Sequence, residues 1–180
     1  MTIFIALLRA IGPATHAKMS MADLRDGYIA AGLKNVATYI QTGNVIFETR
    51  KSAAAAQNAV ATVVRGFGLA NDVVLRTPGE LAAVVAANPF PKAAADHPSH
   101  LVVCFMAATP PAEALHALEQ HRGPERIKRV GRDLCIDYPT GVTGAKLTPG
   151  VIERRLATVG TARNWNTVRK LLALAQAGTR

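Results

Sequence analysis

The sequence predicts an α+β protein of two tandem ferredoxin-like (βαββαβ) subdomains with antiparallel sheets, followed by a C-terminal helix. The first half alternates short apolar runs with stretches of helical periodicity in the order β-α-β-β-α-β, which is the ferredoxin-like order. The order returns in outline after a segment with three prolines between residues 89 and 98. With 49% apolar residues over 180 positions, the chain can also fill a hydrophobic core.

The first subdomain is predicted over residues 1–88 and ends in a trailing helix. Its expected strands are 2–8, 35–40, 44–48 and 73–76. Its expected helices are 20–32, 52–67 and 77–87, and residues 10–19 are expected to form a loop. Ser20 with Asp23, and Thr77 with Glu80, have the spacing at which two side chains cap each other's backbone N–H at a helix start.

A linker is predicted at residues 89–99 and the second subdomain at residues 100–180. The expected strands are 101–106, 126–130, 134–138 and a short fourth strand at 158–159. The expected helices are 110–122, 148–157 and 164–177. Gly178 follows the last helix at the C′ position, where a residue with positive φ commonly ends a helix.

The sequence carries no signal for secretion or membrane insertion. No run approaches the roughly 18 apolar residues of a membrane span, and Met1 leads directly into a strand rather than into a basic leader. Cys104 and Cys135 each lie in an apolar strand without a second cysteine at metal-ligand spacing, so we expect buried, reduced thiols. A cytoplasmic protein is expected.

Positive charge is concentrated late in the sequence. The net charge is +9, and residues 122–180 hold twelve Lys or Arg against four Asp or Glu. That segment therefore carries +8, and residues 1–121 carry +1. Clustered cations raise the local concentration of phosphate-bearing ligands, although a basic solvated surface with no partner would have the same composition.

A predicted β-hairpin in the first subdomain has a polar tip. Strand-forming residues flank Gln41, Thr42, Gly43 and Asn44, and Gly43 is free to adopt a positive φ. The amides of Gln41 and Asn44 can each donate and accept a hydrogen bond, so they could bind a ligand or hold the turn together.

Several residue groups resemble the bacterial family known as domain of unknown function 1697. They are Arg9, the Tyr-Ile-Gln-Thr-Gly-Asn-Val-Ile-Phe run at 39–47, Asn-Pro-Phe at 88–90, Lys-Leu-Thr at 146–148, and Thr-Ala-Arg-Asn-Trp-Asn-Thr-Val at 161–168. The resemblance implies two tandem α+β subdomains of ferredoxin-like character. It implies no activity.

The chain departs from that family's pattern in the first loop. Relatives usually have Gly-Ile-Asn-Val-Gly-Gly after the arginine, whereas residues 10–15 read Ala-Ile-Gly-Pro-Ala-Thr. Thr42 and Ala145 also stand where serine is typical. Loss of the asparagine and of most of the glycines removes hydrogen-bond donors and backbone freedom from the loop, so any ligand binding there would be altered or absent.

Nine residues are candidate ligand contacts: Arg9, Tyr39, Gln41, Thr42, Asn44, Lys146, Arg163, Asn164 and Asn166. Residues 163–167 lie where a helix begins, so they could hold an anion with the free N–H groups there or simply cap the helix. The glycine-containing loop 141–148 could hold an anion through Lys146 and Thr148, or be a plain connection. It lacks the spacing of a phosphate-binding P-loop.

Motifs of catalysis are missing from the sequence. It has no Gly-x-Ser-x-Gly, His-Glu-x-x-His or Cys-x-x-Cys, and its five histidines are scattered. We expect no metal and no cofactor, and a binding protein is favoured over an enzyme. With 5% aromatic residues, base stacking on an open sheet face, as in RNA-recognition motifs, is disfavoured.

The charge pattern favours a non-enzymatic protein that binds an anionic, phosphate-bearing partner, with nucleic acid first among such partners. One alternative is an enzyme or sensor for a small anionic metabolite held in a cleft between subdomains, lined by Tyr39, Gln41, Asn44, Lys146 and Arg163. A second is a homo-oligomeric interaction protein. The sequence leaves a monomer and a homodimer equally open.

Overall fold

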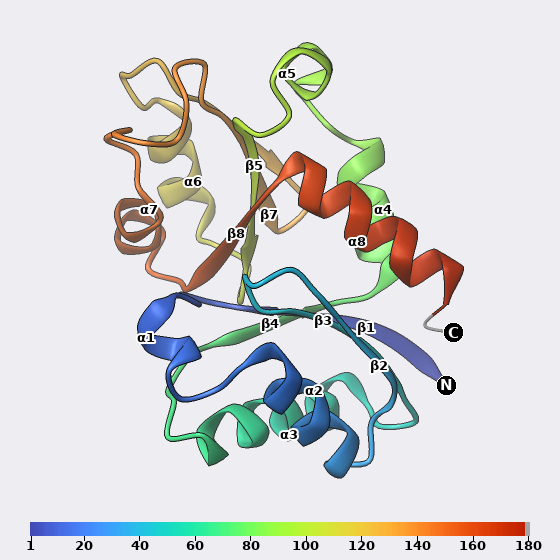
Figure 1. Cartoon of the computed structure of the whole chain (residues 1–180). Helices are drawn as coiled ribbons and strands as arrows, with labels where there is room; N and C mark the ends of the chain where they lie inside the picture. The colour runs from blue at the N-terminus through green and yellow to red at the C-terminus, as the bar shows by residue number, and fades with distance from the viewer. Residues whose placement is uncertain (179–180) are drawn as a thin grey trace. The chain divides into compact units, whose positions relative to one another are not determined.

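The computed structural model describes residues 1–178 and divides into two compact units, Met1–Leu81 with Leu171–Arg180, and Ala82–Lys170 (Figure 1). Each unit contains a four-stranded antiparallel sheet with helices, which confirms the predicted fold class. The division falls inside two helices, α4 (Pro78–Ala86) and α8 (Trp165–Ala177). The linker at 89–99 stays a prediction, and positions 179–180 of the predicted second subdomain lie outside the described residues.

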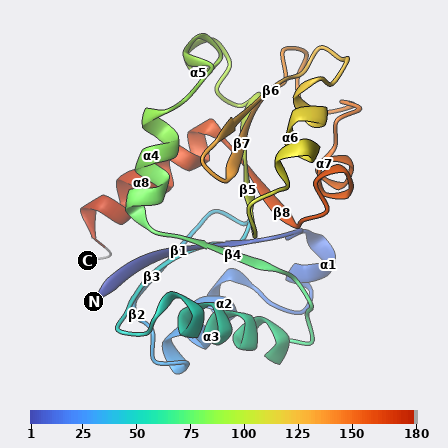
Figure 2. The ribbon, with the colours of Figure 1, turned by 180° about the vertical axis from the view of Figure 1, so that it is seen from behind.

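The first unit is built on the strand order β2-β3-β1-β4. The strands are β1 (Thr2–Leu8), β2 (Lys34–Tyr39), β3 (Asn44–Thr49) and β4 (Val73–Arg76), all antiparallel to their neighbours. Helices α2 (Met21–Ala30) and α3 (Ala53–Gly66) cover one face of the sheet (Figures 1 and 2). Alternate β1 residues Phe4, Ala6 and Leu8 pack toward these helices because side chains alternate between the faces of a strand.

Local capping signals in the first unit are confirmed. Ser20 accepts from the Asp23 backbone N–H while the Asp23 carboxylate accepts from the Ser20 N–H, so α2 begins with a reciprocal cap. Thr77 and Glu80 make the same pair of bonds at the start of α4. The loop after β1 departs from expectation, because it contains the short helix α1 (Pro13–His16), which begins with a proline at its first turn.

The second unit repeats this topology with the strand order β6-β7-β5-β8. Its strands are β5 (Leu101–Met106), β6 (Arg126–Val130), β7 (Asp133–Asp137) and β8 (Gly160–Asn164), and its helices are α5 (Pro91–Asp96), α6 (Ala112–Glu119) and α7 (Pro149–Leu156). Helices α6 and α7 lie on one face of the sheet and pack with it into a second hydrophobic core. Helix α5 was expected to be linker.

The fourth strand was predicted at residues 158–159, but it lies at Gly160–Asn164, about two residues further along the chain. Helix α7 ends at Leu156, and its C-cap Ala157 adopts a left-handed conformation with φ 50°. Two further residues follow before the chain pairs with β5 at Gly160. Gly160 permits the close approach, since a Cβ there would lie 2.9 Å from both the Cys104 Sγ and the Met106 Sδ. The polar Thr-Ala-Arg-Asn composition of β8 hid the strand from sequence reasoning.

Both sheets are also buried on the face opposite their own helices. In the first unit Ile5 and Leu7 are 0% exposed, and in the second Val103 and Phe105 are 0% exposed. Burial on both faces explains why β1 and β5 read as continuous apolar runs rather than as alternating ones.

The two cysteines are free and buried, as predicted. Cys104 pairs in register with Leu134, so Cys135, one residue further along β7, points to the opposite face of the sheet. Burial raises the pKa of each thiol to about 12. Both side chains behave as small apolar residues rather than as nucleophiles.

Candidate functional site

The tip of the β2–β3 hairpin is held by its own side chains. Asn44 is 0% exposed, and its Nδ2 donates to the Tyr39 carbonyl at 3.0 Å and to the Thr42 Oγ1 at 2.8 Å. Of the two roles open to this amide, the structure shows the one that holds the turn. Gln41 and Thr42 remain exposed at the tip.

Gly43 brings the hairpin tip against the end of β1. It has φ +75°, and the Leu8 backbone N–H donates to its carbonyl at 2.8 Å. A Cβ at this position would lie 2.6 Å from the Ile11 Cγ1 and 2.7 Å from the Leu8 Cβ. Arg9 follows Leu8 directly. The five predicted ligand contacts of the first unit therefore lie together: Arg9, Tyr39, Gln41, Thr42 and Asn44.

The altered first loop is tied to this tip and to the loop before β4. The His16 ring Nε2 lies 2.8 Å from the Gln41 carbonyl oxygen. Asn71 Nδ2 donates to the carbonyls of Arg9 and Ala10, at 2.8 and 3.2 Å, and Ala10 adopts a positive φ of 54°. The loop is therefore ordered by contacts that do not require the glycines typical of relatives.

The junction of β8 and α8 uses its polar residues locally. Asn164 Oδ1 accepts from the Thr167 backbone N–H at 3.0 Å, which caps α8. Arg163 is only 7% exposed, and its Nη1 donates at 2.8 Å to both the Thr161 Oγ1 and the Ala162 carbonyl. Burial lowers the pKa of Arg163 to about 10, so the guanidinium stays charged at neutral pH. Asn166 is exposed.

Lys146 lines a pocket of about 300 Å³ within the second unit. The pocket lies between the loop that leads from α6 to β6 and the glycine-containing loop that leads from β7 to α7. Arg122, Thr140 and Thr143 contribute further polar side chains to its lining, and none of these three was predicted. Among residues 1–178, neither Lys146 nor Arg122 makes a side-chain ion pair or hydrogen bond.

The one carboxylate in this pocket is already engaged. Glu125 Oε2 lies 3.0 Å from the His121 Nε2, and both side chains are largely buried. Burial acts to raise the pKa of Glu125, but its own backbone N–H, the His121 ring and the Leu147 N–H outweigh it and leave the pKa below its usual value. Gly123 leaves room for the pair, because a Cβ there would lie 2.4 Å from the His121 Nε2 and from the Glu125 Oε2.

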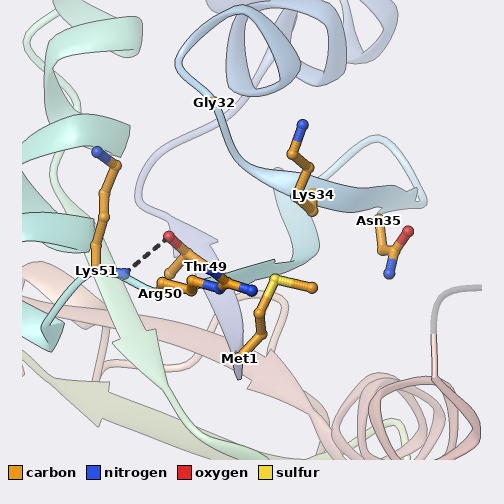
Figure 3. Close-up of a pocket in the computed structure, with 7 residues that line it drawn as sticks. All are labelled: Met1, Gly32, Lys34, Asn35, Thr49, Arg50 and Lys51. Atoms are coloured by element: carbon orange, nitrogen blue, oxygen red, sulfur yellow. Dashed lines mark hydrogen bonds between the residues drawn. The ribbon is translucent and has the colours of Figure 1, made fainter.

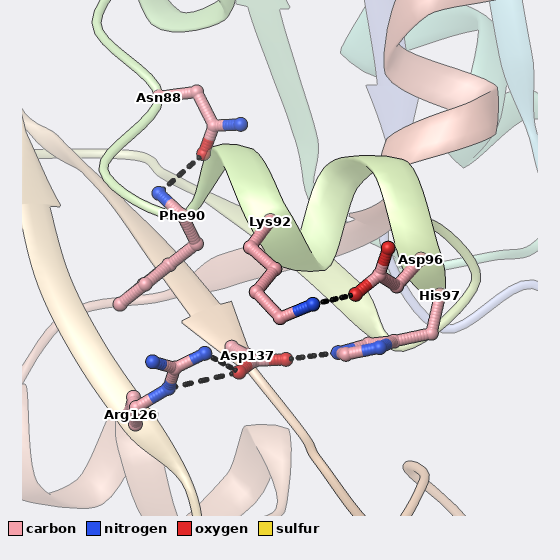
Figure 4. A network of polar contacts seen from close by, with 7 residues as sticks. All are labelled: Asn88, Phe90, Lys92, Asp96, His97, Arg126 and Asp137. Atoms are coloured by element: carbon pink, nitrogen blue, oxygen red, sulfur yellow. Dashed lines mark hydrogen bonds and ion pairs between the residues drawn. The ribbon is translucent and has the colours of Figure 1, made fainter.

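A second polar cluster in the same unit escaped sequence reasoning (Figure 4). Asp137 is 0% exposed, and its carboxylate accepts from the Arg126 Nε at 3.0 Å and lies 2.9 Å from the His97 Nε2. The Arg126 guanidinium also lies 5.1 Å from the Phe90 ring centroid. The cluster joins the 88–100 segment to β6 and β7. No local signal announces it, because His97 and Asp137 are forty residues apart.

The Asn-Pro-Phe motif at 88–90 belongs to this cluster. Asn88 Oδ1 accepts from the Phe90 backbone N–H at 3.0 Å, forming a side-chain turn that starts α5, and Phe90 is 9% exposed beneath Arg126. Its role in this structure is to pack α5 against the sheet.

Across residues 1–178, no group of three or more His, Cys, Asp or Glu side chains could hold a metal ion. Within the same range, no helix is both long and apolar enough to cross a membrane.

Comparisons with known proteins bear on the fold and the family. A solved structure described as that of the conserved bacterial protein SP0830 from Streptococcus pneumoniae is similar, with a TM-score of 0.77 and 20% sequence identity over 98% of this chain and 99% of that one. At this identity the likeness shows a shared fold. No curated protein matches the sequence.

The sequence profile of one family matches residues 1–134, and its description is "Protein of unknown function (DUF1697)". The matched range includes Arg9, the hairpin and the Asn-Pro-Phe motif, and it ends before Lys146 and the 161–168 run. It covers about three quarters of the 180 residues. The chain therefore belongs to the DUF1697 family.

Proposed function

We propose that the protein binds a phosphate-bearing partner without transforming it, and that the partner is nucleic acid contacted through its backbone phosphates. The observation that carries this proposal is the Lys146 pocket, where two cationic side chains without partners among residues 1–178 lie beside two hydroxyl groups. Lys and Arg are the usual donors to phosphate oxygens, and Thr hydroxyls supplement them.

The electrostatics of the pocket favour an anion. Its single carboxylate, Glu125, has Oε2 3.0 Å from the His121 Nε2, so that oxygen is engaged within the pocket rather than directed at a ligand. Arg122 and Lys146 are both exposed, so an approaching phosphate displaces water rather than an internal partner. Binding of a phosphate in this pocket therefore breaks no ion pair of Arg122 or Lys146 among residues 1–178.

Further exposed cations occur on other elements of the same unit. Lys128 on β6 and Arg154 and Arg155 on α7 are exposed, and α6 packs against both β6 and α7. An extended set of phosphate contacts is what sequence-independent nucleic-acid binding requires. The buried central strands favour backbone contact over base stacking.

The net charges of the two units support only a modest general attraction to polyanions. Residues 82–170 hold twelve Lys or Arg against seven Asp or Glu, and the remaining residues hold nine against five. The two units thus carry +5 and +4, because the +7 of residues 122–170 is reduced by a net −2 over residues 82–121. The pocket, more than the summed charge, supports the proposal.

A titration with short single-stranded and double-stranded oligonucleotides tests it. We expect binding that weakens steeply between about 50 mM and about 200 mM salt, because each phosphate contact releases counterions. The double variant Arg122→Gln/Lys146→Gln should bind more weakly. The slope of log K against log salt concentration should become shallower by about one to two, which is about one for each phosphate contact removed. Lys92→Gln, which removes an exposed cation of the same unit outside the pocket, is the matched control.

A small anionic metabolite is the competing ligand for this pocket, since a volume of about 300 Å³ admits a phosphate group with a small substituent. Oligonucleotide binding that is absent at the lower salt, with stabilisation by a small phosphate instead, would replace nucleic acid by that ligand. Equal affinity of the pocket variant and the Lys92→Gln control would remove the pocket from the proposal.

A further inference from the structure

A larger cavity lies within the first unit, between the turn that follows α2 and the segment that joins β3 to α3 (Figure 3). Its volume is about 680 Å³. The side chains of Lys34, Arg50 and Lys51 line it together with those of Asn35 and Thr49. None of these residues belongs to the Lys146 pocket, and none was predicted to bind a ligand.

The lining carries three positive charges and, among the described residues, no Asp or Glu. Lys34, Arg50 and Lys51 are exposed, and within residues 1–178 none of their side chains forms a hydrogen bond or an ion pair. Glu48 faces Lys34 across the β2–β3 ladder, but the two form no ion pair. Three cations around one hollow produce a positive potential that internal partners leave uncompensated.

The backbone around the cavity is fixed by local structure. Asn35 adopts a positive φ of 47°, and the β2–β3 register shifts between Lys34 and Ala37, which displaces the start of β2 from regular pairing. On the other side, the Lys51 backbone N–H donates to the Thr49 Oγ1 at 3.1 Å. The cations therefore project from ordered positions, which lowers the entropy lost when a ligand binds.

Helix α3 adds to the field from the same side. It begins two residues after Lys51, is capped by Ser52, and has no acidic residue in its first turn. The positive end of its dipole is therefore not offset by a carboxylate of its own.

We propose that this cavity binds a small phosphorylated molecule with at least two negative charges on its phosphate groups, such as a diphosphate ester. Lysine ammonium groups act as point charges on phosphate oxygens, and an arginine can bind two oxygens at once. A volume of about 680 Å³ falls within the roughly 300–1,000 Å³ of small-molecule sites. Met1, which also lines the cavity, offers apolar surface to the rest of the molecule.

Isothermal titration calorimetry of the full chain with inorganic pyrophosphate, ADP and adenosine tests the proposal. Pyrophosphate and ADP are expected to bind, and adenosine, which lacks phosphate, is not. In the double variant Arg50→Gln/Lys51→Gln both affinities should fall by about tenfold for each cation removed. Thermal unfolding of the variant should match that of the parent, because both side chains are exposed and make no internal contact.

Two controls separate this site from the Lys146 pocket and from general charge. Lys18→Gln/Arg65→Gln removes two exposed cations of the same unit outside the cavity, and Lys146→Gln removes the other pocket's lysine. Both should retain the parent affinity for pyrophosphate. Absence of pyrophosphate binding by the parent, an equal loss in the Lys18→Gln/Arg65→Gln variant, or a loss in Lys146→Gln alone would each overturn the proposal. Failure of oligonucleotide binding would overturn the proposal for the Lys146 pocket and would leave the expected pyrophosphate binding by the cavity unchanged.

Discussion

Replacing Gly43 by alanine should destabilise the first unit through two separable effects. The residue has φ +75°, a conformation that L-residues with a Cβ adopt at a cost of about 1 kcal/mol or more. The new methyl group would also meet Ile11 Cγ1 at 2.6 Å and Leu8 Cβ at 2.7 Å. Ile11 can rotate away, but a Cβ position is set by the backbone, so the contact with Leu8 can be relieved only by moving the backbone of β1 or of the hairpin tip.

The size of the second effect follows from the packing around β1. Leu8 is 0% exposed, and its backbone N–H is bonded to the Gly43 carbonyl, so a shift of either residue disturbs that bond. Overpacking of this kind costs about 1–3 kcal/mol. Together with the left-handed backbone, Gly43→Ala should therefore lower the free energy of unfolding by about 2–4 kcal/mol.

Gly68→Ala is the matched control for backbone strain. Gly68 has φ +70°, but no atom lies within 4 Å of the position its Cβ would take. Both variants lose the same unfolded-state freedom, so this contribution cancels in the comparison. Urea unfolding followed by far-UV circular dichroism measures the free energy of unfolding of both variants. Losses that agree within about 0.5 kcal/mol would refute the close approach of the hairpin tip to β1.

Two further predictions concern the second unit. Arg126→Ala should lower the free energy of unfolding by about 2 kcal/mol, because it removes one of the two partners of the buried Asp137 carboxylate and leaves only His97. Lys128→Ala, on the same strand but exposed and unpaired among residues 1–178, should cost less than about 0.5 kcal/mol in the same urea titration. Glu125 has a folded pKa below its ordinary 4.5, so its contribution is fully present above that value and is lost as the pH falls through the folded pKa. Urea titrations between about pH 3 and pH 7 should show the stability advantage of the parent over Glu125→Gln shrinking on the acid side. An advantage that is constant across this range would contradict the proposed engagement of Glu125 by His121.

Local sequence signals predicted the elements well. Apolar runs predicted seven of the eight strands described in residues 1–178 to within about two residues, because burial in a sheet requires such runs. Helix starts at Ser20 and Thr77 were recognisable because a cap involves residues three positions apart. The polar strand β8 was misplaced, since its position depends on pairing with β5 rather than on its own composition.

The candidate site was less accessible to sequence reasoning. The hairpin residues were predicted as a group, but whether the amide of Asn44 faces a ligand or its own turn depends on burial. Residues 163–167 were expected either to hold an anion or to cap the helix, and the Arg163 side chain is buried against its own strand. One local signal was present and not used: the adjacent pair Arg50 and Lys51 immediately before the helix cap Ser52.

The sequence by itself determined the two α+β units, the order of their strands and of all helices described except α1 and α5, the caps and the reduced state of the cysteines. Each of these follows from interactions between residues close in the chain or from a periodic apolar pattern. Tertiary structure alone decided which charges from distant segments are paired. Asp137 finds His97 and Arg126 from distant segments, while Lys34, Arg50 and Lys51 find no partner among residues 1–178 and line a common cavity. Charge pairing depends on distances in space, and these are set only when the sheets and loops have packed.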